Sequence, residues 1–553
     1  MSARERDVDL VNGALYRPLM VLSLPIVASQ LMQVAYNLVN TYWVGHIGPD
    51  AIAAVSFAFP LVFLLISLGS GFAIAGTALV AQHRGADQQR QVDHVAGQTI
   101  TFTALASAAL GVVGWILSPW LVSLIGATPG STIHLWAVQY TRVTFAGVFA
   151  MYGFFVFQAL LRGWGDTRTP MYLMGFGVLL NAILDPFLIY GFTDNQLLQL
   201  LGLPGLQTTL FHLTGFAGFG VEGAAFATLV SRGVAAAVGL GLLFSGRVGI
   251  HLSRRNVIPD PTAIAKIVRV GLPASVDQST RALGMTVVTA LVATSGPTAV
   301  AAYGIGIRLN SLVFLPAIGL AQGTSTAVGQ NLGAGKPERS RKAVLYAAGT
   351  LAVVLAFASV VAWFEAGPIV GIFVGAGADR ANVIADGVQF LRIIGPTFLF
   401  LGVFRVTTSA FRGSGHTTTA MAFTILSLWV FRLPPAYALL AWFGLGASGV
   451  WYAIAFSNVL TAVLTFLWFR RGTWASAVIE DERGDPGGGP GPETATTAGA
   501  AGEGGTETPA GPTEPEAGET GPAETERSTA GEPETAGTGR TTAGETATGP
   551  DRD

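Results

Sequence analysis

The chain has 553 residues, of which 51% are apolar and 12% are charged, and its formal net charge is −2. A soluble protein of this length would carry roughly twice that charged fraction, so the composition indicates a membrane protein. Cysteine is absent, which excludes disulfides, thiolate metal sites and cysteine nucleophiles.

A short polar segment, residues 1–16, precedes twelve apolar segments of membrane-spanning length. The apolar stretch that begins after Arg17 is too long for a signal peptide, so we expect no cleavable signal. The predicted spans are 18–45, 51–81, 97–125, 133–161, 170–191, 218–245, 263–294, 298–331, 343–375, 382–411, 418–443 and 447–470. The 192–217 segment is longer than its neighbouring loops, and a short interfacial helix and a plain loop are equally compatible with it.

Basic residues alternate between the two sides of these spans. They fill the loops on one side and both ends of the chain, whereas Arg380 is the one exception on the other side. Because positive residues stay on the cytoplasmic side, we expect both termini in the cytoplasm and the protein in the plasma membrane. The basic residues of that side are Arg4, Arg6, Arg17, Arg84, Arg90, Arg162, Arg168, Arg247, Arg254, Arg255, Lys266, Lys336, Arg339, Arg341, Lys342, Arg412, Arg470 and Arg471.

The end of the chain has a different composition. From Glu480 onward there are 17 acidic and 4 basic residues and almost no large apolar side chain. Such a segment cannot bury enough surface to offset its chain entropy, so we expect a disordered acidic cytoplasmic tail over residues 472–553. The predicted divisions are thus the segment 1–16, a lobe at 17–246, a cytoplasmic linker at 247–262, a second lobe at 263–471, and this tail.

The two lobes repeat one another. Leu24-Pro25 matches Leu272-Pro273 at an offset of 248 residues, and Gln82 with Gly85 matches Gln330 with Gly333 at the same offset. Arg162-Gly163 matches Arg412-Gly413 at an offset of 250. Since six spans is an even number, the halves enter the membrane in the same direction as parallel repeats. We therefore predict an all-α polytopic protein with twelve transmembrane helices in two six-helix lobes around a central cleft.

Several of these motifs also resemble those of a known family. They are the segment Tyr36–Gly45, the run Arg162-Gly163-x-Gly165-Asp166-Thr167, the run Asn181–Pro186, and Gln330-Asn331-x-Gly333-Ala334-Gly335. Together they resemble the multidrug and toxic compound extrusion (MATE) family, and more closely its archaeal and DinF-like branch, over residues 15–471. The resemblance implies a cation-coupled antiporter that expels amphipathic, often cationic compounds, with H⁺ or Na⁺ as the coupling ion and no other cofactor.

Ionisable residues inside membrane spans are costly and are functional candidates by default. Asp185 lies in the fifth span, four residues after Asn181, so its carboxylate and the amide share one helix face. Pro186 weakens the local helix and can free backbone carbonyls. These oxygens could hold Na⁺, or the carboxyl could exchange a proton. A purely structural Asp185, tying the fifth span to its neighbours, is the alternative.

Asn40 marks a departure from the family pattern. The branch usually has Asp at this position of the first span, and an amide can bind Na⁺ but cannot titrate. A mechanism that protonates an acid in the first span is therefore in doubt for this chain. Either Asp185 acts alone, or charge has moved to the second lobe, where we expect a network of Asp277, Arg281, Arg308 and Arg405. Asp277 and Arg281 are four residues apart and suit an ion pair. A static packing network is as compatible with these four residues as a functional one.

Aromatic and thioether side chains are candidates for the wall of the cleft, because flat and polarizable surfaces suit varied amphipathic cations. Tyr36 and Asn37 are preferred because they share the first span with Asn40. The other candidates are Tyr140, Met151, Phe154 and Met174. Any one of these aromatic residues could instead be a packing or interfacial anchor.

Three functions remain to be compared. A secondary antiporter of small molecules is the first. A lipid-linked oligosaccharide flippase of a related fold is the alternative, kept open by Arg281, Arg308 and Arg405. A passive channel or receptor is disfavoured by the repeat and by Asp185. The histidines lack metal-ligand spacing, nothing indicates an enzyme or a nucleic-acid partner, and one chain can hold a complete transport path, so we expect a monomer.

Overall fold

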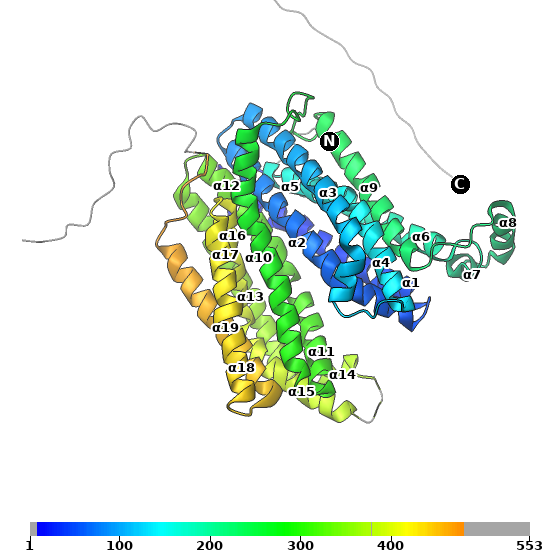
Figure 1. The fold of residues 1–553 in the computed structure, drawn as a ribbon. Helices are drawn as coiled ribbons and strands as arrows, with labels where there is room; N and C mark the ends of the chain where they lie inside the picture. The colour runs from blue at the N-terminus through cyan, green and yellow to red at the C-terminus, as the bar shows by residue number, and fades with distance from the viewer. Residues whose placement is uncertain (1–7, 376, 378, 480–553) are drawn as a thin grey trace, which may run out of the picture. The chain divides into compact units, whose positions relative to one another are not determined.

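The computed structural model describes residues 8–375, 377 and 379–479. Residues 1–7 of the predicted N-terminal segment, and the part of the predicted 472–553 tail from Glu480 onward, lie outside these residues. The first part of that tail, residues 472–479, is described, and Trp474, Ala477 and Ile479 are buried in a hydrophobic core, so the expected disorder was wrong there. The described helices form two groups, which we call the N-lobe (α1–α9) and the C-lobe (α10–α19), with α2 packed against α10 (Figure 1).

The N-lobe has six long helical segments and two short helices. The short ones are α7 (Gln196–Leu200) and α8 (Pro204–Thr214), so the helical alternative for the 192–217 segment is confirmed. The long segments are α1 (Tyr16–Gly45), α2 (Pro49–Gly85), α3 (Gln89–Leu124), the pair α4 (Thr132–Ala146) and α5 (Val148–Trp164), α6 (Arg168–Tyr190) and α9 (Val221–Phe244).

The C-lobe repeats this plan. Its one additional short helix is α14 (Ala366–Phe373). The long segments are α10 (Pro261–Ala293), the pair α11 (Pro297–Val313) and α12 (Leu315–Gly333), α13 (Pro337–Phe364), α15 (Arg380–Ile394) continued through the 3₁₀ turn Gly395–Thr397 into α16 (Phe398–Gly413), α17 (Thr417–Ile425) continued through the π-helical turn Leu426–Val430 into α18 (Leu433–Ala441), and α19 (Gly446–Arg470).

These segments account for the twelve predicted spans. Within the described residues, nine helical segments are long and apolar enough to cross a membrane, and two bent helix pairs raise the number to eleven. The remaining segment is α10, whose 33 residues include Asp277 and Arg281 and are therefore less apolar. Large apolar side chains on the long helices are exposed, such as Leu24, Trp120 and Phe357, as a lipid-facing surface requires. The predicted all-α, twelve-span, two-lobe fold is confirmed.

Helix breaks inside four spans are the feature that the apolar pattern did not predict. The axis bends by 50° between α4 and α5 at Gly147, and by 46° between α11 and α12 at Phe314. Pro316, Pro396 and the pair Pro434-Pro435 follow three of the four breaks. Proline lacks the N–H that would continue the helix, so each of these breaks has a local chemical cause.

Local capping fixes the start of α10. Asp260 accepts a hydrogen bond from the backbone N–H of Thr262 at 2.9 Å, and Pro261 occupies the first helical position. Hydrogen bonds to the carboxylate, first of all the one from the Thr262 N–H, hold the pKa of Asp260 below its ordinary value. The helix that carries Asp277 and Arg281 therefore begins at a fixed residue.

The repeated motifs of the two lobes meet each other at one end of the molecule. The Nε2 of Gln82 donates to the carbonyl of Gly413 at 3.0 Å, and the Nε2 of Gln330 donates to the carbonyl of Gly163 at 3.0 Å. A Cβ on Gly85 would lie 1.8 Å from the Gln330 carbonyl oxygen, and a Cβ on Gly333 would lie 1.8 Å from the Gln82 carbonyl oxygen. We call these six residues the glycine–glutamine seal, and their near-twofold pairing explains why both halves repeat the same glycines and glutamines.

Other inter-lobe hydrogen bonds lie on the same side. Arg162 donates to Gln322 Oε1 at 2.6 Å, and Ser275 Oγ donates to the carbonyl of Leu68 at 2.9 Å. Ser23 of α1 lies against Gly323 of α12. These contacts use the first half of α1 and of α10, the second half of α2, and α12, so the lobes are joined at the end that carries the basic loops.

Candidate functional site

Asp185 and Asn181 lie together on the buried face of α6. Both side chains are 0% exposed, and Asn181 Nδ2 donates to Asp185 Oδ1 at 3.2 Å. Asp185 Oδ2 and Asn181 Oδ1 are also buried, and neither has a hydrogen-bond partner. Two oxygens without hydrogen-bond partners, one of them from a carboxylate, thus lie on one helix face. A proton or a small cation bound there would lower the electrostatic cost of burying the carboxylate.

The end of α6 is held by Asn195. Its Nδ2 donates to the carbonyls of Pro186 at 3.1 Å and Gly191 at 2.9 Å. Pro186 has no N–H to offer to the preceding turn, which loosens the helix beside Asp185. The helix nevertheless continues through Pro186 to Tyr190, so the Asp185 carboxyl lies one residue before a missing backbone N–H donor.

The candidates on α1 lie at different depths. Tyr36 is buried, and its hydroxyl is 2.6 Å from Thr228 Oγ1 of α9. Asn37 is exposed and accepts a hydrogen bond from Gln33 Nε2 at 3.1 Å. Asn40 Oδ1 is buried without a partner, and the residue lines a pocket of about 300 Å³ bounded by α1 and α2. Among the described residues, no hydrogen bond joins Asn40 to Asp185 or Asn181.

Arg232 of α9 was not among the predicted site residues, yet it lies among three of them. Its guanidinium lies 5.1 Å from the ring centroid of Tyr36 and 4.6 Å from that of Phe154. It donates to Gln33 Oε1 at 2.6 Å and contacts Met174 Sδ at 3.4 Å. Three of the predicted wall residues thus surround a cation that belongs to the protein. An arginine at the middle of a 24-residue apolar helix was the signal that could have found it.

The two remaining wall candidates are packed in hydrophobic clusters. Tyr140 lies in a cluster with Trp43 and Ile189. Met151 packs with Leu65 in a separate cluster. Neither joins the group around Arg232.

The expected charge network of the C-lobe is correct in part. Arg281 Nε donates to Asp277 Oδ1 at 3.2 Å, as the four-residue spacing predicted, and Arg412 donates to Asp277 Oδ2. Arg405 lies near this group without a hydrogen bond to Asp277, and its buried Nε has no partner. Arg308 is exposed on α11, so its inclusion was wrong. Arg412, which its position in the sequence placed in a loop, instead lies in the last turn of α16 and reaches Asp277.

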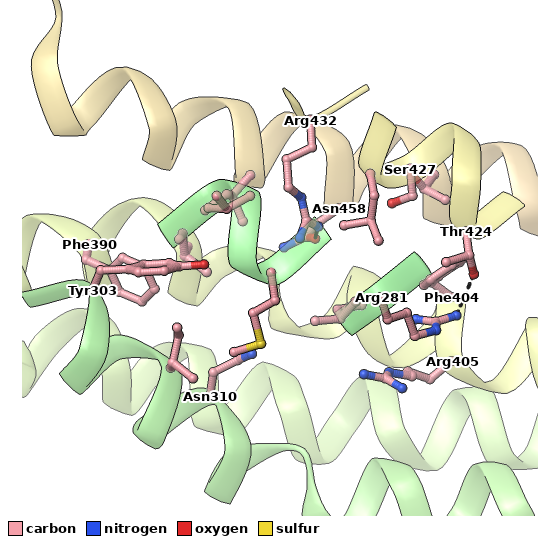
Figure 2. Close-up of a pocket in the computed structure, with 18 residues that line it drawn as sticks. Arg281, Tyr303, Asn310, Phe390, Phe404, Arg405, Thr424, Ser427, Arg432 and Asn458 are labelled. Carbon is pink, nitrogen blue, oxygen red and sulfur yellow. Dashed lines mark hydrogen bonds between the residues drawn. The ribbon is translucent and has the colours of Figure 1, made fainter. Parts of the chain in front are cut away.

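A cavity of about 200 Å³ lies beside this network (Figure 2). Arg281, Arg405 and Arg432 extend into it from α10, from α16 and from the break between the π-helical turn and α18. The aromatic side chains of Tyr303, Phe390 and Phe404 form part of its wall.

The model of the MatE family matches residues 25–187 and 273–438. The matches begin at Pro25 and Pro273, the same 248-residue offset as in the internal repeat, so each lobe carries one copy of the family's unit. The chain belongs to the MatE family.

Individual relatives agree with this assignment. A Bacillus subtilis protein described as a probable multidrug resistance protein, YpnP, is 26% identical over 86% of this chain and 99% of its own length. The FAD transporter of Shewanella oneidensis is 24% identical over 83% of this chain and 95% of its own length. An outward-facing structure of a multidrug resistance MATE transporter is 26% identical, with a TM-score of 0.74, over 84% of this chain and 97% of that one.

Membership of the MatE family confirms several expectations. The protein is a multi-pass membrane transporter of the multidrug efflux type and not an enzyme, and the flippase alternative is not favoured. The assignment to the archaeal and DinF-like branch stays a prediction. Within the described residues, no group of three or more His, Asp or Glu side chains could hold a metal ion.

The position of Arg232 leads to one testable prediction. If Tyr36 and Phe154 form a wall for cationic substrates, Arg232 occupies that wall and competes with them. Arg232→Gln is expected to tighten tetraphenylphosphonium binding by roughly 2- to 30-fold. This range corresponds to the free energy of a single cation–π contact, from an exposed one to a desolvated one. Calorimetric titration of the full chain in detergent measures this, with the exposed Arg168→Gln as the matched control. Unchanged affinity would show that this wall does not bind the cation.

Proposed function

We propose that this MatE-family protein is a secondary active antiporter that exports amphipathic, often cationic, small molecules in exchange for H⁺ or Na⁺. The observation that carries the proposal is the buried pair on α6, where Asp185 Oδ2 and Asn181 Oδ1 have no partner. A carboxyl of this kind changes its charge, or gains a bound cation, at the moment an ion enters. That is the property a coupling site needs.

The inter-lobe contacts support alternating access. The lobes are joined at one end by the glycine–glutamine seal and by the Arg162–Gln322 hydrogen bond, and the similar solved transporter is described as outward-facing. An ion at Asp185 would have a different free energy when this seal is closed and when it is open. Only such a difference can make ion and substrate exchange obligatory.

The same contacts support an orientation. The seal lies at the end of the lobes that carries the basic loops, which the positive-inside rule places in the cytoplasm. We therefore place both termini in the cytoplasm and the protein in the plasma membrane, acting as a monomer. Small-molecule substrates and the lipid bilayer are the partners that this arrangement requires.

Transport by the reconstituted protein tests the proposal. Proteoliposomes loaded with ethidium are given an outside-to-inside H⁺ or Na⁺ gradient, and dye efflux is followed by fluorescence. We expect efflux that depends on one of the two gradients and stops when that gradient is collapsed with an ionophore. Efflux that is equal with and without both gradients would contradict antiport and favour a passive path.

A further inference from the structure

The charged side chains that line the C-lobe cavity are all positive. Arg281, Arg405 and Arg432 line it from three different segments of the lobe, as Figure 2 shows. Among the residues that line it, none is acidic. The carboxylate that contacts a lining arginine is that of Asp277, which is 0% exposed and already pairs with Arg281 and Arg412. Counting Asp277 and Arg412 with the three lining arginines leaves three positive charges uncompensated.

Apart from the ion pair of Arg281 with Asp277, the lining arginines have neutral partners or none. Arg432 donates from Nε to Ser457 Oγ at 2.8 Å and from Nη2 to Asn458 Oδ1 at 2.8 Å. Arg281 donates from Nη2 to Thr424 Oγ1 at 2.6 Å. The Nε of Arg405 is buried with no hydrogen-bond partner, although the guanidinium lies within range of repulsion from Arg281. Hydroxyl and amide oxygens orient these guanidinium groups without neutralising them.

Such an arrangement is costly in a membrane-spanning bundle. Charged side chains at this depth are normally paired with an opposite charge, because the lipid and the protein interior solvate them poorly. Structural packing would be served as well by one arginine with one acid, as Arg281 and Asp277 already show. The surplus of positive charge therefore requires another explanation, and an anion that enters the cavity supplies the missing charge.

The rest of the wall limits the kind of anion. Tyr303 and Phe390 pack edge to face with centroids 6.1 Å apart, and Phe404 lies 5.5 Å from the Arg281 guanidinium. A planar apolar group fits against such rings, whereas the guanidinium groups match the bidentate geometry of a phosphate or carboxylate. We infer that the C-lobe cavity is a binding site for amphipathic organic anions that join an aromatic ring to a phosphate or carboxylate group.

The helix break at Arg432 is part of this site. The π-helical turn Leu426–Val430 and the prolines Pro434 and Pro435 interrupt the span, and Arg432 lies in the gap. Interruptions of this kind in membrane helices occur where the backbone lines a cavity. The inference that the cavity binds an anion depends only on the geometry of the cavity. Its use as a substrate site rests on the transport proposed above.

Binding of three naphthalene probes tests the inference. 1-Naphthyl phosphate, 1-naphthol and (1-naphthylmethyl)trimethylammonium share one ring system and differ in charge. They are titrated by calorimetry into the full chain in detergent. We expect the phosphate to bind at least tenfold more tightly than the alcohol and the ammonium compound. Arg405→Gln should remove at least tenfold of that affinity, while Arg405→Lys retains part of it and the exposed Arg392→Gln on α15 changes nothing.

Thermal unfolding without ligand provides an independent readout. Because Arg405 carries an uncompensated charge and its buried Nε has no partner, Arg405→Gln should raise the Tm of the unliganded protein or leave it unchanged, even as it weakens anion binding. A fall in Tm with unaltered phosphate affinity would assign Arg405 a packing role and overturn the inference, as would equal binding of all three probes. Anion binding without gradient-driven efflux would support the anion site and contradict antiport. Cation antiport without anion binding would support antiport and contradict the anion site.

Discussion

Asp185→Asn is expected to reduce gradient-driven efflux by at least about 100-fold, to the level of protein-free liposomes. The substitution keeps the size of the side chain and the hydrogen bond from Asn181, which joins the two residues at 3.2 Å. It removes the charge from a group that is 0% exposed and whose Oδ2 has no partner. Binding of the exported dye, measured in detergent, should change by less than about threefold, because the variant retains the fold but not the ion-dependent charge.

Asp194→Asn is the matched control for this result. Asp194 is exposed in the segment after α6 and accepts a hydrogen bond from Gln199 Nε2 at 2.7 Å, so its substitution should leave efflux unchanged. Full coupled transport by the Asp185 variant would make Asp185 a structural residue and direct attention to Asp277. Loss of dye binding together with transport would instead indicate misfolding.

Asn181→Leu separates the two candidate ions. Na⁺ takes several oxygen ligands, so loss of the Asn181 Oδ1 should raise the Na⁺ concentration for half-maximal efflux roughly tenfold or more if Na⁺ is the coupling ion. A proton needs only the carboxyl, so a proton-driven protein should keep its coupling. The half-maximal ion concentration in the liposome assay distinguishes these two outcomes.

Gly333→Ala is expected to open the seal between the lobes. The added Cβ would lie 1.8 Å from the Gln82 carbonyl oxygen, and the space cannot be gained from a flexible side chain because both atoms belong to backbone or Cβ. Overlap of this kind costs typically about 1–3 kcal/mol, which corresponds to a shift of roughly 5- to 150-fold in the population with separated lobes. Since the chain contains no cysteine, Ser23→Cys gives a single reporter thiol.

Ser23 is 3% exposed and lies against Gly323 of the other lobe, so the reporter is protected when the seal is closed. Maleimide labelling of Ser23→Cys should be at least fivefold faster with Gly333→Ala than without it. Gly349→Ala is the control, because a Cβ on this helical glycine of α13 meets no atom within 4 Å. An unchanged labelling rate in the Gly333 variant would mean that the seal does not control separation of the lobes.

Local spacing predicted part of the candidate site correctly. Asn181 with Asp185, and Asp277 with Arg281, are each four residues apart on one helix, and both pairs form the contacts that this spacing favours. Arg232 and Arg412 were missed or misplaced because their partners lie on other helices. Arg412 was assigned to a loop by its position in the sequence, yet its side chain reaches Asp277, 135 residues away along the chain. The prediction that Arg308 joins the charge network was wrong because Arg308 lies on the exposed face of α11, which nothing in the sequence distinguishes from the buried face.

The sequence by itself determined the number of spans, the division into two parallel repeats and the family, because hydrophobic length, motif spacing and proline position are properties of short segments. The tertiary structure alone decided how those segments meet. It pairs Gln82 with Gly413 and Gln330 with Gly163, surrounds Arg232 with the residues expected to bind cations, and gathers three arginines from separate segments around one cavity. Such contacts depend on helix rotation and packing between lobes, which the apolar pattern of a nearly uniform membrane helix leaves undetermined.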